Sequence, residues 1–157
     1  MAAKARPGGE EAAEKKQIHQ MGLLLRVAKE VAAIDTLDEM LRSIVEVSAH
    51  ETGAERGTLF LNDERTGELY SRVAQGASVR EIRILNNTGI AGHVFTTGLG
   101  VVVHDAYSDP RFHRGVDQET GFVTRNIACA PIRTAKGEII GVLQMLNKHH
   151  GHFNDDD

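Results

Sequence analysis

The sequence predicts an α+β domain in which helices pack against an antiparallel sheet. Apolar residues repeat at helical spacing over roughly the first 50 residues. From about residue 57 they alternate with polar ones, as in strands, and turn residues separate the alternating stretches. The chain has 157 residues, 41% of them hydrophobic and 25% charged, which suits one globular domain preceded by a long helix.

The composition argues against several classes of partner. The net charge is −4, whereas a nucleic-acid-binding protein would carry a basic face, so no nucleic acid is expected. The single cysteine, Cys129, argues against a disulfide framework and thiol-based zinc sites. No apolar run reaches the roughly 18–20 residues of a membrane span, and the N-terminus lacks the apolar core of a secretory signal. We therefore expect a cytoplasmic protein.

The N-terminal region divides into a lead and a helix. Residues 1–12 are small, charged and contain Gly and Pro, so we expect a disordered lead or a remnant of cloning. Residues 13–34 carry two apolar rows at steps of three and four: Ile18, Met21, Leu25, Ala28 and Ala32, and beside them Leu24, Val27, Val31 and Ile34. Because this stripe is wider than one domain's core requires, we expect the helix to pair with its copy in a homodimer. The alternative is that it packs on its own domain.

Residues 35–157 are expected to form the domain itself. Asp35 or Thr36 is the N-cap of an amphipathic helix that ends near Gly53. The following elements are expected to be strands at 57–62, 69–75 and 81–85, a short helix at 89–97, and strands at 101–103, 126–133 and 138–148. Residues 104–125 form a loop whose length is typical of a functional segment.

Three features of this domain favour a ligand pocket over the sheet. Gln144 interrupts an apolar last strand, and a buried amide needs a hydrogen-bond partner. Residues 127–131 have small side chains, which leave space on the sheet. Residues 89–92 open the short helix, with Thr88 as a possible N-cap, and its first N–H groups could hold an anion. The long loop adds three hydrogen-bonding side chains, Asp117, Thr120 and Thr124, which could instead be a solvated, self-capping loop.

Neither a catalytic nor a metal site is expected. His149, His150 and His152 lie beside an acidic end and are interpreted as a solvated tract, because metal ligands must converge. The sequence contains no readable Ser/His/Asp or Cys/His arrangement, and Cys129 lies in mid-strand, where cysteine is usually a small buried apolar residue.

Four blocks of sequence resemble the GAF domain family and occur in the family's order. They are ERGTLFLNDERTGELYSRV, GIAGHVFTTG, DAYSDPRFHRGVDQETGFVTRNIACAPI and GEIIGVLQMLNK. They are most similar to the cyclic-nucleotide-binding GAF domains of mammalian phosphodiesterases and cyanobacterial adenylate cyclases, and the resemblance extends over about residues 36–157. It implies a central antiparallel sheet with N-terminal and C-terminal-side helices on one face and a lid-covered ligand pocket on the other.

The resemblance also implies the ligand and its contacts. The ligand would be cAMP or cGMP, with no further cofactor and no metal. Ile90 and Ala91 would donate backbone N–H groups to the cyclic phosphate. The full set of implied contacts is Thr58, Ala74, Gln75, Ile90, Ala91, His113, Asp117, Thr120, Thr124 and Gln144. A family motif of structural support would comprise Asn147, Lys148, Phe153 and Asp157, with Lys148 and Asp157 forming an ion pair.

The sequence departs from the family's pattern at the base-binding end. Ala74 stands where an aromatic residue commonly packs on the base, and Gln75 and Gln144 replace acidic residues of some cGMP-binding relatives. Guanine presents two neighbouring donor groups, which suit a carboxylate. Adenine presents a donor beside an acceptor, which an amide matches. We therefore expect cAMP to be favoured over cGMP.

The expected function is that of a regulatory sensor domain, not an enzyme. A cyclic nucleotide would bind beneath residues 104–125 and signal through the N-terminal helix to an effector domain such as a cyclase, phosphodiesterase, kinase or transcriptional regulator. The alternative is a GAF domain without a nucleotide ligand that serves as a dimerisation module. Methionine sulfoxide reduction and tetrapyrrole sensing, also found in the family, would require thiols at places where this chain has none.

Overall fold

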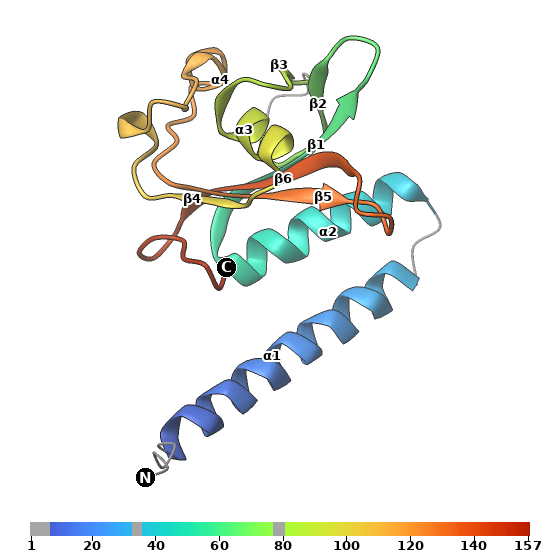
Figure 1. Cartoon of the computed structure of the whole chain (residues 1–157), viewed down its shortest axis with the longest axis vertical. Coiled ribbons are helices and arrows are strands. Elements are labelled where there is room, and N and C mark those ends of the chain that lie inside the picture. The colour runs from blue at the N-terminus through green and yellow to red at the C-terminus, as the bar shows by residue number, and fades with distance from the viewer. Residues whose placement is uncertain (1–6, 33–35, 77–80) are drawn as a thin grey trace. The chain divides into compact units, whose positions relative to one another are not determined.

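The structure is a computed structural model that describes residues 7–32, 36–76 and 81–157 (Figure 1). The chain divides into two units, residues 1–43 and 44–157. The first unit contains helix α1 (Pro7–Ala32) and the start of helix α2 (Leu37–Thr52), and the second contains the remainder of α2 and every strand. In the described part of the chain, no helix is both long and apolar enough to cross a lipid bilayer.

Helix α1 begins earlier than the sequence indicated. It starts at Pro7, so residues 7–12 are helical and do not belong to a disordered lead. The reason is local: proline is favoured in the first turn of a helix, and Lys15 Nζ lies 2.7 Å from Glu11 Oε1, one turn away. The expected end at Ile34 lies outside the described residues. The apolar rows of α1 are exposed to solvent: the side chains of Ile18, Met21, Leu24 and Leu25 are 55–66% accessible.

Helix α2 is capped by Thr36, one of the two expected candidates. The Glu39 N–H donates to Thr36 Oγ1 at 3.2 Å, and Thr36 Oγ1 donates to Glu39 Oε2 at 3.0 Å. Farther along α2, Val45 and Ala49 are buried. A Cβ atom on Gly57 would lie 2.8 Å from Val45 Cγ1, so the helix packs closely against the first strand.

The sheet has six strands, all antiparallel to their neighbours, which confirms the expected α+β class. The spatial order is β3-β2-β1-β6-β5-β4. The strands are β1 (Ala54–Asp63), β2 (Glu68–Ala74), β3 (Arg83–Leu85), β4 (Val101–Val103), β5 (Ile127–Arg133) and β6 (Ile139–Lys148). The long strands β1 and β6 are therefore central, and they supply residues to both faces.

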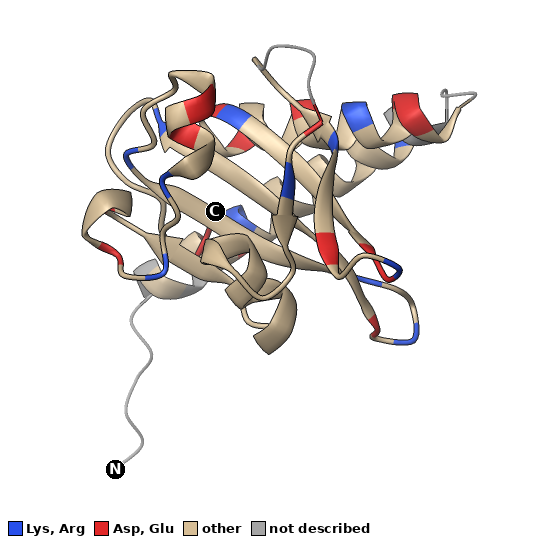
Figure 2. Ribbon diagram, turned by 90° about the horizontal axis from the view of Figure 1, so that it is seen from above, with Lys and Arg blue, Asp and Glu red and all other residues tan. Residues whose placement is uncertain are grey.

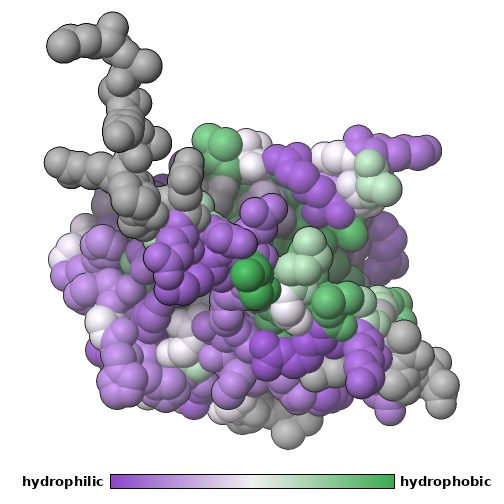
Figure 3. Space-filling view, turned by 90° about the horizontal axis from the view of Figure 1, so that it is seen from below, coloured by the Kyte–Doolittle hydropathy of each residue, from purple (hydrophilic) through white to green (hydrophobic). Residues whose placement is uncertain are grey.

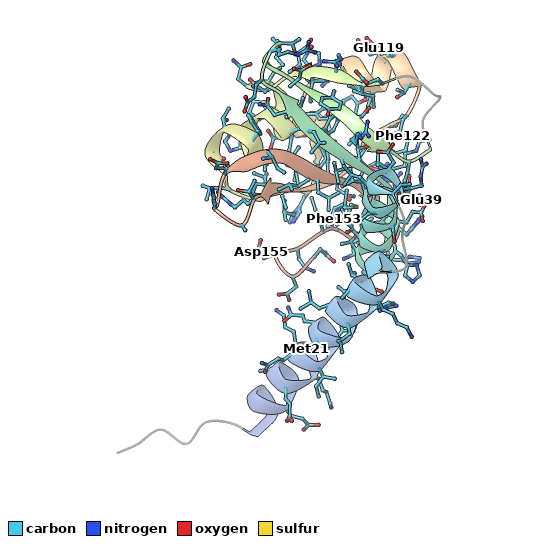
Figure 4. The ribbon with its side chains drawn as sticks, turned by 90° about the vertical axis from the view of Figure 1, so that its right-hand side faces the viewer. Met21, Glu39, Glu119, Phe122, Phe153 and Asp155 are labelled. Carbon is cyan, nitrogen blue, oxygen red and sulfur yellow. The ribbon has the colours of Figure 1, made fainter. Side chains whose placement is uncertain are left out.

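One face of the sheet packs against α2 from Ile44 onward and against the C-terminal segment (Figure 1). Figure 4 labels Phe153 on that segment; the residue is 1% exposed and clusters with Ala49 of α2 and Met145 of β6. The expected C-terminal-side helix is wrong for the described residues, because residues 149–157 form bends and a turn. Gly151 has a φ of 77°, which interrupts a helix, and Asp157 closes the turn by accepting the Asn154 N–H at 2.9 Å.

The opposite face packs against α3 (Gly89–Thr97) and residues 104–125, here called the lid segment. Two short helices lie in this segment, where the sequence analysis expected only a loop: η1 (Ala106–Ser108) and α4 (Gly115–Thr120). Gly121 ends α4 with a φ of 73°, and its N–H donates to Asp117 O at 2.8 Å. A six-residue helix is too short to reveal itself by apolar periodicity.

Candidate ligand-binding site

A cavity of about 320 Å³ lies between the sheet, α3 and the lid segment. Its volume is at the lower end of the range of roughly 300–1,000 Å³ that is typical of small-molecule sites. The lining is mostly apolar, with a few polar groups. It comprises Thr58, Phe60, Ile82, Arg83, Ile84, Leu85, Thr88, Gly89, Ile90, Ala91, Phe112, His113, Val116, Asp117, Thr124, Ile127, Gln144 and Leu146.

The N-terminus of α3 presents backbone donors to this cavity. Gly89 has a φ of 74°, which turns the chain into the helix, and the first helical hydrogen bond is donated by Gly92 N–H to Thr88 O at 3.1 Å. Thr88 occupies the N-cap position, but its hydroxyl bonds Asn87 Oδ1 and does not cap the helix. Within the described chain, the N–H groups of Ile90 and Ala91 therefore have no acceptor.

No charged side chain accompanies these donors on the helix itself. Figure 2 shows α3 entirely in tan, because the helix contains no Lys, Arg, Asp or Glu. An anion at this end of the cavity would be held by backbone N–H groups and by the positive end of the helix dipole.

Two polar side chains meet on the floor of the cavity. Thr58 of β1 and Gln144 of β6 are direct partners in the strand register, so their side chains lie next to each other on one face of the sheet. Thr58 is buried and Gln144 half-buried. Neither side chain has a hydrogen-bond partner in the part of the chain that the structure describes, and both face a space that a ligand could fill.

By contrast, the carboxylate of Asp117 already accepts three hydrogen bonds within the lid segment. Asp117 Oδ2 accepts the Thr124 N–H at 2.7 Å and the Tyr107 hydroxyl at 2.8 Å, and Asp117 Oδ1 accepts the Thr124 hydroxyl at 2.7 Å. This hydrogen bond from the phenol to a carboxylate raises the pKa of Tyr107. Asp117 thereby joins η1, α4 and the end of the lid segment.

Asn147 ties the end of the lid segment to β6. The residue is fully buried and has a φ of 57°, the one positive φ among described residues other than glycine. Its Oδ1 accepts the Arg125 N–H at 2.6 Å, and its Nδ2 donates to Val123 O at 2.8 Å and to Glu55 Oε2 at 3.3 Å. The Arg125 guanidinium, 2.6 Å from Glu55 Oε1, lowers the pKa of Glu55.

A second attachment lies beside it. The Arg56 guanidinium lies 4.0 Å from the centroid of the Phe122 ring, which Figure 4 labels at the end of the lid segment. On the other face of the sheet, Lys148 Nζ lies 2.6 Å from each carboxylate oxygen of Asp157, the ion pair that the resemblance implied. These contacts fix the lid segment and the C-terminal segment to the same end of the β1–β6 pair, where β1 begins and β6 ends.

The model of the GAF domain family matches residues 36–157. The chain belongs to the GAF domain family. Its sequence is 34% identical over 155 residues to the probable 3',5'-cyclic phosphodiesterase pde-5 of Caenorhabditis elegans, covering 90% of this chain and 21% of that protein. It is 31% identical over 154 residues to the dual 3',5'-cyclic-AMP and -GMP phosphodiesterase 11 of Drosophila melanogaster, covering 88% of this chain and 11% of that protein. The chain therefore spans only a small part of these relatives.

Solved GAF domain structures share the fold. The GAF domain of a phosphoenolpyruvate-protein phosphotransferase from Coxiella burnetii superposes with a TM-score of 0.76 at 25% identity, covering 87% of this chain and 82% of that one. The free methionine-R-sulfoxide reductase of Neisseria meningitidis superposes with a TM-score of 0.71 at 24% identity, covering 86% of this chain and 77% of that one. At 24% identity, the similarity to the methionine-R-sulfoxide reductase shows a shared fold and says nothing about activity.

The structure brings seven of the ten expected contact residues of this GAF domain to the cavity: Thr58, Ile90, Ala91, His113, Asp117, Thr124 and Gln144. The other three are not among the lining residues. Ala74 lies at the end of β2, Gln75 Oε1 accepts the Gly57 N–H at 2.8 Å, and the Thr120 hydroxyl donates to Val116 O at 2.8 Å.

Sequence reasoning missed most of the apolar lining. Phe60 and Leu146 could have been found, because each lies two residues from a predicted contact on the same strand and hence on the same face. Phe112 and Val116 could not, because the lid segment has no regular period from which their direction follows.

Proposed function

We propose that this GAF domain is a regulatory sensor that binds a cyclic nucleotide in the cavity beneath the lid segment. One observation carries the proposal: the N–H groups of Ile90 and Ala91, which have no acceptor in the described chain, lie at one end of a mostly apolar cavity of nucleotide size. The two relatives, which are named as cyclic-nucleotide phosphodiesterases, support the same ligand class.

The cyclic phosphate would lie at the N-terminus of α3. Two converging N–H groups and the helix dipole favour a singly charged phosphate, and the nine-residue helix has no acidic residue in its first turn to oppose it. The ribose and base would fill the apolar part of the cavity toward Thr58 and Gln144.

We favour cAMP over cGMP because of the groups at the base end. The Gln144 amide can donate and accept at once, as the edge of adenine does, and the Thr58 hydroxyl beside it can do either. Gln75, the other residue that the resemblance placed near the base, is engaged through its side-chain oxygen by the backbone of β1. The one carboxylate among the described lining residues, Asp117, already accepts three hydrogen bonds from Tyr107 and Thr124, which leaves it little capacity for the two donors of guanine.

Binding would be signalled through the N-terminal helix to an effector domain in a cytoplasmic homodimer. Such coupling requires that the nucleotide bind one arrangement of the helices more tightly than another. A specific observation favours the second candidate function, a dimerisation module without a nucleotide: the exposed apolar row of α1, with Ile18, Met21, Leu24 and Leu25. Apolar surface is also visible among hydrophilic residues on the face shown in Figure 3.

The deciding experiment measures nucleotide binding to the full chain by thermal shift and calorimetry. A ligand at 100 times its Kd adds about 2.7 kcal/mol, which raises Tm by roughly 5–10 °C for a domain of this size. We expect cAMP to bind more tightly than cGMP, and adenosine, which lacks the phosphate, to bind far more weakly than either. If neither cAMP nor cGMP binds, the sensor proposal is refuted and the dimerisation module remains as the proposed function.

Two matched pairs of variants test nucleotide binding and dimerisation separately. Gln144→Leu is expected to weaken cAMP binding about tenfold, whereas Gln118→Leu, on an exposed position of α4, leaves it unchanged. Leu25→Glu is expected to give monomers in light scattering, whereas Leu99→Glu, at a similarly exposed leucine outside α1, does not.

A further inference from the structure

Tyr107 contacts two groups of the cavity wall although it is not itself among the lining residues. Its hydroxyl donates to Asp117 Oδ2 at 2.8 Å. Its ring lies 5.2 Å from the ring of Phe112 at an interplanar angle of 53°. The Arg114 guanidinium lies 4.6 Å from the centroid of the same ring and donates to Tyr107 O at 3.3 Å.

We propose that Tyr107 is a positioning residue that holds the Phe112 ring and the Asp117 carboxylate in place at the cavity wall. The inference rests on the proposed function, since it concerns how the same cavity is shaped for its nucleotide. Tyr107 does not touch the ligand and acts through these two neighbours.

The hold on Asp117 comes from two directions. Thr124 bonds both carboxylate oxygens from the end of the lid segment, and Tyr107 bonds Oδ2 from η1. Hydrogen bonds to an ionised acceptor are roughly twice as strong as neutral ones. Without the phenol O–H, the carboxylate is held on one side only, and η1 loses its side-chain bond to α4.

The hold on Phe112 comes from the ring. A tilted pair of aromatic rings is a favoured geometry, and a guanidinium over Tyr107 adds a cation–π contact. Tyr107 is 38% exposed and so reaches Phe112 from outside the cavity, while Phe112 forms part of the wall. Tyr107, with the Arg114 guanidinium over its ring, therefore packs on the side of the Phe112 ring that faces away from the cavity and holds this part of the wall in place.

The test compares Tyr107→Phe, which keeps the ring, with Tyr107→Leu, which removes it. Tyr70→Phe is the matched control: Tyr70 is the other tyrosine, its ring lies under the Arg83 guanidinium, and its hydroxyl has no hydrogen-bond partner in the described part of the chain. By calorimetry with cAMP, we expect Tyr107→Phe to weaken binding about threefold to tenfold, Tyr107→Leu to weaken it further, and Tyr70→Phe to leave it unchanged.

A double-mutant cycle separates positioning from a general effect on stability. In an Asp117→Ala background, Tyr107→Phe is expected to have little further effect on the cAMP Kd, because alanine has already removed the acceptor of the Tyr107 hydroxyl. Equal effects in both backgrounds, or unchanged affinity of Tyr107→Phe, would overturn the proposal.

A second readout keeps the test independent of nucleotide binding. The Thr124 amide proton, bonded to Asp117, is expected to exchange with solvent faster in Tyr107→Phe than in Tyr70→Phe. If the full chain binds no nucleotide, the proposed function fails while this exchange rate still decides the role of Tyr107: faster exchange supports it, and an unchanged rate overturns it.

Discussion

Replacing Asn147 by alanine is expected to release the end of the lid segment from β6. The side chain is inaccessible to solvent, and its strongest bonds go to backbone groups of the lid segment: the Arg125 N–H at 2.6 Å and Val123 O at 2.8 Å. Alanine leaves both part-buried groups without a side-chain partner, and no other side chain in the described structure bonds them.

The magnitude follows from these two groups and from the backbone. Each part-buried group left unbonded costs about 1 kcal/mol, the lower end of the range for buried groups. A φ of 57° is tolerated by asparagine but costs alanine roughly 1–2 kcal/mol. We therefore expect Asn147→Ala to lower the free energy of unfolding by about 3–4 kcal/mol, a large part of the roughly 5–15 kcal/mol of a typical domain.

Urea unfolding followed by circular dichroism measures this loss, and Asn147→Gly divides it into its parts. Glycine removes the same hydrogen bonds but adopts a positive φ without strain, so the glycine variant should be about 1 kcal/mol more stable than the alanine variant. An alanine variant within 1 kcal/mol of the parent, or a glycine variant less stable than the alanine one, would refute the reasoning.

Three further predictions concern other parts of the second unit. Gly141→Ala should prevent folding, as judged by circular dichroism, because its Cβ would overlap the Phe60 carbonyl oxygen. The Arg111 guanidinium lowers the pKa of Asp109 below its ordinary value of 3.8. Their ion pair therefore stabilises the fold above pH 3.8, and this stabilisation is lost as the pH falls below that value. In acid unfolding, the stability of Asp109→Asn should fall less steeply than that of the parent between about pH 4 and 2. Burial raises the pKa of Cys129 to about 12, so a disulfide reagent at pH 8 should modify this thiol only after urea unfolds the domain.

The elements that the sequence predicted well are those with a local pattern. Alternation of apolar residues located the strands, and the cap at Thr36 marked the start of α2. The two N–H groups at Ile90 and Ala91 were also predictable, because every helix begins with unbonded donors and glycines bracket this one.

The parts that could not be predicted depend on contacts between distant positions. Asn147 bonds Glu55, 92 positions away, and Gln75 bonds the backbone of Gly57, 18 positions away. Neither bond leaves a trace in spacing or composition. The same holds for Tyr107, whose role follows only from three neighbours in a segment without a regular period.

Two sets of polar groups at the cavity differ in whether they have hydrogen-bond partners, and this difference constrains the ligand. Asp117 and Thr124 already bond each other, so a ligand gains less from them than from groups that have no partner. The Ile90 and Ala91 N–H groups at one end and Gln144 at the other have no partner in the described chain. An apolar ligand of the same size would bury these groups unbonded, at about 1–3 kcal/mol each. The ligand that fits at least cost therefore carries an anionic acceptor at one end and an edge with both donor and acceptor at the other, with an apolar body between them.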